Sequence, residues 1–349
     1  MKQYDIKYVP YGEVDKLQTF IEKHWKTSHA LVRSTELLDF QHLDKHNNRY
    51  NFVVASNKIT NDYDALLGFI PSSQYDKNLV ENGDYWGAIW KVRTDVSNEE
   101  KSFIGIEVFD YLLNKIGLKS IAAIGISSIA KKIYAIKDWQ IGFLHHYYII
   151  NDRLDKFFIA KNVNKINRSC EVSESVISTS YSVKWLDSDL NGIKIESKYR
   201  PYKTVDYFLN RYSKHPFYKY RFLGVYENNK LISIWATRTI FIEVSKVIRV
   251  VDVLGELKGN INQQLMQLIY DEEAEYIDFL NYGVDKLVFK QMGFNELSFD
   301  EDLIIPNYFE PFEQKNIKIE LAYKADFNYV VFKGDSDQDR PNIINSNDD

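Results

Sequence analysis

The sequence predicts an α/β protein with mixed sheets of the α+β kind, built as two similar domains in tandem. Length is the first reason, because 349 residues exceed one ordinary core and suit two domains of about 150 residues each. Composition is the second, since 45% hydrophobic and 27% charged residues are typical of a globular protein. The third reason is a repeated order of strand and helix patterns.

Two segments carry the repeat most clearly, "AKKIYAIKDW" at Ala130–Trp139 and "DKLVFKQMGF" at Asp285–Phe294. Each is predicted to form a helix after a short apolar strand. An amphipathic helix and a further strand precede that strand in both halves. In the first half, the strand lies at 86–93, the amphipathic helix at 104–120 and the short apolar strand at 121–129. In the second half, the same three elements lie at 247–255, 259–275 and 276–284. The shared order indicates two copies of one domain.

A β-hairpin is predicted before each of these units. It comprises residues 50–57 and 65–71 in the first half, and residues 220–240 in the second, where Glu227-Asn-Asn-Lys230 reads as the turn. More strand follows each unit, at 142–150 and 317–324. We therefore expect domains at 1–155 and 156–333. Residues 334–349 are polar and charged, which predicts a disordered tail.

Charge and cysteine content exclude several classes of protein. A net charge of −5 gives no basic field to attract nucleic acid. One cysteine, Cys170, cannot build a disulfide framework or a cysteine-based zinc site. The N-terminus lacks the apolar core of a signal peptide, and no apolar run approaches the roughly 20 residues that span a bilayer. We expect a soluble, cytoplasmic protein with no membrane or nucleic-acid partner, and the sequence leaves a homo-oligomer open.

The order helix, hairpin, long strand, turn, helix, strand, helix, strand resembles the GNAT acyltransferase superfamily. The resemblance implies that acyl-CoA lies where the long strand separates from its neighbour, with its pyrophosphate on a glycine-rich turn at the next helix start. In "KSFIGI", Lys101 and Gly105 match the basic residue and last glycine of that turn, whereas Phe103 replaces the middle glycine. The second-half turn, "LGELKGNI", places the acidic Glu256 near the pyrophosphate.

The first half is therefore the predicted acyl-CoA site. Its predicted cofactor residues are Trp90, Lys91, Val92, Arg93, Lys101, Ser102, Phe103, Ile104, Gly105, Ile106 and Ser127. Side chains of Lys91 and Arg93 suit phosphates, although charges at such positions are also common on a solvated edge. The family's last helix carries Ala-x-x-x-Tyr, which Ala130 and Tyr134 keep and Phe289 does not. Tyr134 is thus the predicted acid for the leaving thiolate, with a core ring as the alternative.

A narrower resemblance comes from "HWKTSHALVRSTELLDFQH", "LLGFIPSSQYD", "YWGAIWKV" and "GFLHHYYIIN". These segments look like tandem-GNAT sugar N-acyltransferases of bacterial surface-polysaccharide pathways, such as lipopolysaccharide O-antigen or capsule. The resemblance implies an acyl-CoA donor and a nucleotide-linked amino-dideoxy sugar as acceptor, for example dTDP-3-amino-3,6-dideoxygalactose. It covers about residues 20 to 325.

Amide formation from a thioester needs a base for the amine but no covalent nucleophile. His29 is the predicted base or substrate contact, because it precedes the helix that overhangs the acceptor cleft in this superfamily. The other predicted substrate residues are Ser34, Glu36, Gln41, His42, Tyr308 and Phe309. Ser34 and Glu36 equally suit a helix start. The insertion at 199–222 suits either a nucleotide diphosphate or an amphipathic helix packed in the protein.

No metal is expected, since the histidines show no ligand spacing. Two rival functions remain. One is a tandem-GNAT transferase that uses aminoacyl-tRNA, which the acidic balance disfavours. The other is an inactive GNAT pair that acts as a binding protein, which the degenerate phosphate turns favour.

Overall fold

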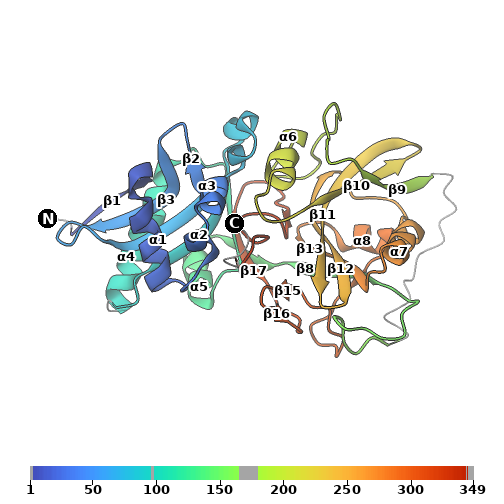
Figure 1. Ribbon diagram of the computed structural model, residues 1–349. Coiled ribbons are helices and arrows are strands. Elements are labelled where there is room, and N and C mark those ends of the chain that lie inside the picture. The colour runs from blue at the N-terminus through green and yellow to red at the C-terminus, as the bar shows by residue number, and fades with distance from the viewer. Residues whose placement is uncertain (1–2, 96–97, 165–179, 343, 345–349) are drawn as a thin grey trace. The chain divides into compact units, whose positions relative to one another are not determined.

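The computed structural model describes residues 3–95, 98–164, 180–342 and 344 (Figure 1). Cys170 lies outside these residues. The chain divides into two compact units. The first comprises residues 1–124, 323–326 and 340–349, and the second comprises residues 125–322 and 327–339.

The first unit contains a mixed sheet with the strand order β1-β3-β4-β5-β6, and β2 also pairs with β3. All neighbours in it are antiparallel except β5 and β6, which are parallel. The strands are β1 (Tyr4–Pro10), β2 (Leu43–Asp44), β3 (Arg49–Asn57), β4 (Tyr63–Pro71), β5 (Asp84–Val92) and β6 (Ser120–Ile124). The hairpin predicted from two apolar runs is thus β3 and β4.

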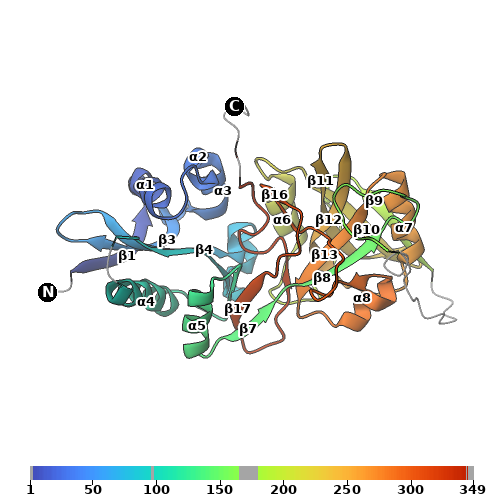
Figure 2. The same cartoon turned by 90° about the horizontal axis from the view of Figure 1, so that it is seen from below.

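Helices cover both faces of this sheet. Figure 2 shows α1, α2 and α3 on one face and α4 on the other. Their bounds are α1 (Val14–His24), α2 (Ala30–Arg33), α3 (Thr35–His42) and α4 (Asn98–Lys115), and short 3₁₀ turns lie at Tyr11–Glu13, Ser72–Gln74 and Lys77–Asn82. Because both faces are covered, β3 and β4 are buried along nearly their whole length.

The second unit contains a sheet with the order β14-β8-β13-β12-β11-β10-β9, and β18 also pairs with β13. Its strands are β8 (His145–Ile150), β9 (Tyr181–Leu186), β10 (Arg221–Glu227), β11 (Lys230–Ile242), β12 (Ser245–Gly255), β13 (Tyr276–Tyr282), β14 (Asn295–Glu296) and β18 (Val331–Phe332). Strand β7 (Gln140–Phe143) neighbours β17 (Glu320–Lys324), and β15 (Tyr308–Phe309) pairs with β16 (Phe312–Glu313) in a separate two-stranded sheet. The predicted turn joins β10 to β11, with Asn228 and Asn229 at φ 48° and 66°.

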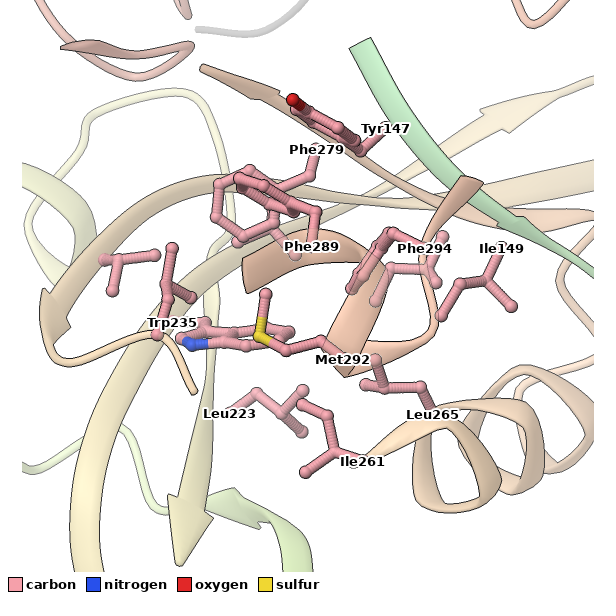
Figure 3. Close-up of a cluster of buried hydrophobic side chains, with 14 of the residues drawn as sticks. Tyr147, Ile149, Leu223, Trp235, Ile261, Leu265, Phe279, Phe289, Met292 and Phe294 are labelled. Atoms are coloured by element: carbon pink, nitrogen blue, oxygen red, sulfur yellow. The ribbon is translucent and has the colours of Figure 1, made fainter. Parts of the chain in front are cut away.

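The main core of the second unit lies between this sheet and two helices (Figure 3). The rings of Phe279 on β13 and Phe289 on α8 meet edge to face at 5.1 Å, and Tyr147 on β8 stacks on Phe289 at 4.0 Å. The helices of this unit are α5 (Ser128–Ile136), α6 (Val205–Phe208), α7 (Asn262–Asp271) and α8 (Lys286–Met292), and a π-helix spans Leu209–Ser213. Alternate residues of β8, such as Tyr148, face a second core.

The predicted repeat is visible at the ends of α5 and α8. The N–H of Trp139 donates to the carbonyl of Tyr134 at 3.0 Å, and the N–H of Phe294 donates to the carbonyl of Phe289 at 2.9 Å. The residue before each donor, Asp138 or Gly293, has a positive φ. Both helices therefore end through the same left-handed turn.

The unit boundaries differ from the predicted domains in two places. The first is the predicted boundary at residue 155, because β8 pairs with β13 and belongs to the second sheet. The second is the predicted tail at 334–349. Over its described part, Asp335 and Ser336 are buried, so these residues are ordered by contacts that the polar sequence did not suggest. Among the described residues, no helix is both long and apolar enough to cross a membrane.

Candidate active site

Strand β5 separates from β6 partway along its length. The two strands pair from Asp84↔Ser120 to Gly87↔Ala123, whereas β5 continues to Val92. A register shift between β4 and β5 occurs at the same place, since Leu67 pairs with Trp90 but Phe69 pairs with Gly87. This β-bulge bends β5 and ends its pairing with β6. The result is a wedge, called here the first splay, along residues 88–92.

One wall of this region is made by α4. The Trp90 ring stacks on Phe109 of α4 at 5.0 Å and 17°. A Cβ on Gly105 would lie 3.3 Å from the Val92 side chain, so Gly105 lets the helix approach the strand closely. Trp90, Val92 and Gly105 thus come together, although through packing rather than through a phosphate turn.

The predicted phosphate turn at Lys101–Ile106 is wrong in its local structure. These residues lie inside α4, which begins at Asn98. Backbone N–H groups in a helix interior already donate to the preceding turn, so only those of the first turn remain for an anion. Phe103 is exposed, whereas Ile104 is buried and Ile106 half-buried. The side chains of Lys101 and Ser102 lie outside the described residues.

The basic residues at the end of β5 have partners of their own. Arg93 pairs with Asp64 at 2.7 Å and with Asp95 at 2.5 Å. Those hydrogen bonds raise the pKa of Arg93 and lower the pKa of Asp95. The Lys91 ammonium lies 5.8 Å from the centre of the Trp25 ring. The positive charge of Arg93 is therefore already balanced by the carboxylates of Asp64 and Asp95.

His29 forms the N-cap of α2 and is buried. Its Nδ1 accepts the Leu31 N–H at 3.2 Å, and its Nε2 lies 3.1 Å from Nη2 of Arg340. Both ring nitrogens have neighbours, so a role as base requires one contact to open.

Four of the predicted substrate residues lie in α3 or at its N-cap. Ser34 caps α3, with its hydroxyl accepting the Leu37 N–H at 3.1 Å, and Glu36 is exposed in the first turn, where acid suits the helix dipole. Gln41 and His42 are buried. Nδ1 of His42 lies 3.2 Å from the carbonyl of Phe69. The positions of Ser34 and Glu36 match the helix start that the sequence left open as their alternative role.

Helix α5 holds two more predicted residues. Ser127 is its N-cap, and its hydroxyl accepts the Ala130 N–H at 3.2 Å. The Tyr134 ring is buried against Trp139 at 4.5 Å. Burial raises the pKa of the Tyr134 phenol above its ordinary value, which keeps it protonated at neutral pH. It belongs to the second unit, as do Tyr308 and Phe309.

Tyr308 and Phe309 form the small strand β15. Phe309 is buried, stacks on Phe312 at 5.8 Å and lies under the Arg249 guanidinium. Arg249 in turn pairs with Asp278 at 2.5 Å, and Asp278 with His146 at 3.0 Å. This arrangement serves a buried ion-pair network, and only Tyr308 is partly accessible.

A cavity of about 690 Å³ opens beside the π-helix in the second unit. Its aromatic lining consists of Tyr212, His215, Tyr218 and Tyr220, and its polar lining includes Asp189, Asn191, Asp206 and Asn210. Asn191 and Asp206 also line a neighbouring cavity of about 880 Å³. Three of these aromatic residues are tyrosines of the insertion at 199–222, for which the sequence left a nucleotide site and a packed helix open, whereas the aspartates and asparagines gave no signal in the sequence. Rings beside carboxylates and amides suit a ligand with both flat and hydroxylated parts.

Over the described chain, no three histidine, cysteine or acidic side chains lie close enough together to hold a metal ion. The candidate site is thus a backbone wedge with nearby aromatic and basic groups. Such a wedge can bind an extended ligand through main-chain hydrogen bonds.

No family model matches the chain, and no curated protein matches it. Solved structures do. A GCN5-related N-acetyltransferase from Anabaena variabilis aligns with a TM-score of 0.55 and 10% identity, over 92% of this chain and 72% of that chain. A conserved protein from Enterococcus faecalis V583, titled a probable N-acyltransferase, aligns with a TM-score of 0.52 and 9% identity, also over 92% and 72%. The chain therefore has the fold of the GCN5-related N-acetyltransferases.

Proposed function

We propose that this protein is an N-acyltransferase that takes its acyl group from acyl-CoA. The observation that carries the proposal is the first splay, where β5 leaves β6 at Gly87 and continues to Val92. The pantetheine arm of acyl-CoA lies along residues 88–92 and bonds to their backbone. Its pyrophosphate lies at the start of α4, where the helix dipole favours an anion.

The reaction is a direct attack. The amine nitrogen of the acceptor forms a bond to the thioester carbonyl carbon, and the carbon–sulfur bond then breaks. His29 or a water takes the proton that the amine loses. Tyr134 gives a proton to the departing thiolate, so free CoA leaves as the thiol. Burial keeps Tyr134 protonated at neutral pH, so the phenol holds the proton that this step transfers.

The acceptor is a nucleotide-linked amino-dideoxy sugar, and the pathway is surface-polysaccharide biosynthesis. The resemblance of the sequence to tandem-GNAT sugar N-acyltransferases supports this choice. The cavity beside the π-helix adds support, since tyrosine rings suit a base or sugar face and its aspartates suit hydroxyl groups. The acyl-CoA donor, not this acceptor, separates the proposal from a transferase that takes its acyl group from aminoacyl-tRNA.

The experiment is calorimetric titration of the full chain with CoA and short acyl-CoAs, using two matched variants of α4. Lys101→Glu reverses a charge in the first turns of the helix, and Lys115→Glu makes the same change in its last turn. We expect Lys101→Glu to weaken CoA binding by at least about tenfold, because a charge-assisted phosphate contact is lost. Lys115→Glu should change the affinity by less than about twofold. Equal affinities for all three proteins would mean that the pyrophosphate does not bind at the start of α4. If the wild-type protein bound no CoA or acyl-CoA, the proposal that acyl-CoA is the donor would be wrong.

The predicted base can be tested without disturbing its cap. Asparagine is a good N-cap residue, so His29→Asn keeps an acceptor for the Leu31 N–H but cannot take up a proton near neutral pH. We expect kcat to fall by about 100-fold in a thiol-release assay with amino-sugar nucleotides, while the melting temperature stays within a few degrees. An unchanged kcat would leave His29 with its capping role alone.

A further inference from the structure

The second unit has a splay of its own, called here the second splay. Strands β12 and β13 pair in parallel from Ile248↔Ile277 to Val250↔Phe279. Beyond these pairs, β12 continues to Gly255 and β13 to Tyr282. The register between β11 and β12 shifts at the same point, since Ala236 pairs with Asp252 and Thr237 with Val250. Both splays thus begin beside a register shift in the neighbouring antiparallel strand pair.

The second splay is filled by the chain itself. Residues 331–334, called here the plug, lie between the two strands. Val331 and Phe332 pair with Tyr282 and Asn281 of β13. The Lys333 N–H donates to the carbonyl of Leu280 on β13 at 3.1 Å, and the Gly334 N–H donates to the carbonyl of Val251 on β12 at 2.6 Å. The plug therefore bonds to both strands immediately after their last parallel pair.

Gly334 is at the tightest point of the plug. A Cβ there would lie 2.6 Å from the Tyr212 hydroxyl and 2.8 Å from the carbonyl oxygen of Val251. Real Cβ atoms do not approach other atoms so closely, so only glycine fits without displacing the backbone.

Buried charged groups from the insertion hold the residues that follow the plug. Lys203 bridges Asp252 of β12 at 2.5 Å and Asp335 at 2.7 Å. The Arg211 guanidinium donates to the carbonyl of Gly334 and, at 2.6 Å, to the carbonyl of Ser336. Both cationic side chains are nearly inaccessible to solvent. Because breaking a buried pair leaves an uncompensated charge, these contacts oppose release of the plug.

A second anchor lies further along the same segment. Arg238 pairs with Asp339 at 2.9 Å, and the Tyr220 hydroxyl donates to the same carboxylate at 2.6 Å. The Arg238 guanidinium contributes to a lowered pKa for Asp339, although burial alone would raise it. The carboxylate therefore remains ionised and bound at neutral pH.

The turn at 254–261, which was compared above with a glycine-rich phosphate turn, makes contacts within the second unit. The Leu257 N–H donates to the Tyr199 hydroxyl at 3.0 Å. The Tyr181 ring lies where a side chain on Gly259 would start, and Glu256 in the same turn lies 3.6 Å from the Lys258 ammonium. A pyrophosphate there would have to displace these contacts.

We infer that the plug occupies the second splay as a built-in ligand, so that the second unit binds no acyl-CoA and each chain binds one molecule in its first unit. The plug takes the backbone hydrogen bonds that a pantetheine arm takes in the first splay. The stoichiometry rests on the proposed function of the first unit. The closure of the second splay does not.

The test combines calorimetric stoichiometry with residue-resolved hydrogen exchange on the full chain. We expect one CoA per chain. The amides of Lys333 and Gly334 should exchange at least about 100-fold more slowly than in an unstructured peptide, with and without saturating CoA. Binding of two CoA molecules, exchange at the unstructured rate, or loss of protection when CoA is added would each overturn the inference. Protected amides without any CoA binding would support closure and instead refute the proposed function.

A matched pair of glycine variants tests how the plug is seated. Gly334→Val introduces the clash with Tyr212 and Val251, whereas Gly117→Val adds a side chain where nothing lies within 4 Å. We expect Gly334→Val to lose protection at 332–334 by at least about tenfold, with CoA affinity unchanged within about twofold. Gly117→Val should keep both. Full protection in Gly334→Val would contradict the close packing of Gly334 against Tyr212 and Val251. If that variant fails to fold, the wild-type measurements decide the inference.

Discussion

His215 lies in a turn after the π-helix, where its ring accepts two backbone N–H groups. Its Nδ1 accepts from Phe217 at 3.2 Å and from Tyr218 at 2.9 Å. A proton on Nδ1 would remove both bonds. Burial, aided by the nearby Arg211 guanidinium, lowers the pKa of His215 to about 3. The folded protein therefore resists protonation at this site, whereas the unfolded chain takes up the proton near pH 6.5.

This difference predicts acid destabilisation of a defined sign. The stabilisation from neutral His215 is fully present above pH 6.5 and is lost as the pH falls toward 3, by about 4 kcal/mol at pH 3. His215→Asn keeps an acceptor for the turn and should flatten the decrease in unfolding free energy between pH 6.5 and 4, measured by urea denaturation. The control His46→Asn changes an exposed ring and should leave the slope unaltered. Equal slopes for His215→Asn and wild type would show that another group dominates.

At the scale of elements, strands and turns followed closely from the sequence. Apolar runs predicted β3, β4, β5 and β12, and the Asn228-Asn229 pair predicted the turn between β10 and β11. Their causes are local, since pleat periodicity and left-handed backbone preference reside in a few neighbouring residues. Ser34 at the start of α3 was readable for the same reason.

The start of α4 was not readable in this way. "KSFIGI" resembles a glycine-rich turn, yet Gly105 lies inside the helix because α4 must pack closely on Val92. A glycine thus has two causes, a turn or a close approach, and the sequence does not distinguish them. The β-bulge that opens the first splay likewise carries no residue signature, since it depends on the register between two strands.

Over the whole molecule, the least predictable feature was the path of residues 334–339. Their polar and charged composition suggested a disordered tail, because it offers almost nothing to bury. Their partners are Lys203, Arg211 and Arg238, more than a hundred residues earlier. A polar segment can thus be buried when distant charges match it, and composition alone cannot show such a match.

The same long-range organisation predicts how the chain responds to truncation. The repeat suggested a domain at 1–155, but a fragment with those bounds contains β8 without β13, which pairs with it from Tyr276↔Ile150 to Asn281↔His145. The fragment would also lack residues 323–326 and 340–349 of the first unit. Tyr147 and Ile149, which are buried in the second-unit core, would face solvent.

We therefore expect amides of residues 146–150 to exchange at nearly the unstructured rate in the fragment 1–155 and to be protected in the full chain, as measured by hydrogen exchange. A second fragment ending at Ile124 removes β8 and should be the more soluble of the two, because it no longer carries that apolar strand without its partner β13. Protection of β8 within the fragment 1–155 would mean that the strand has another partner there. In that case the sequence-based boundary, rather than the contact-based one, would describe the folding unit.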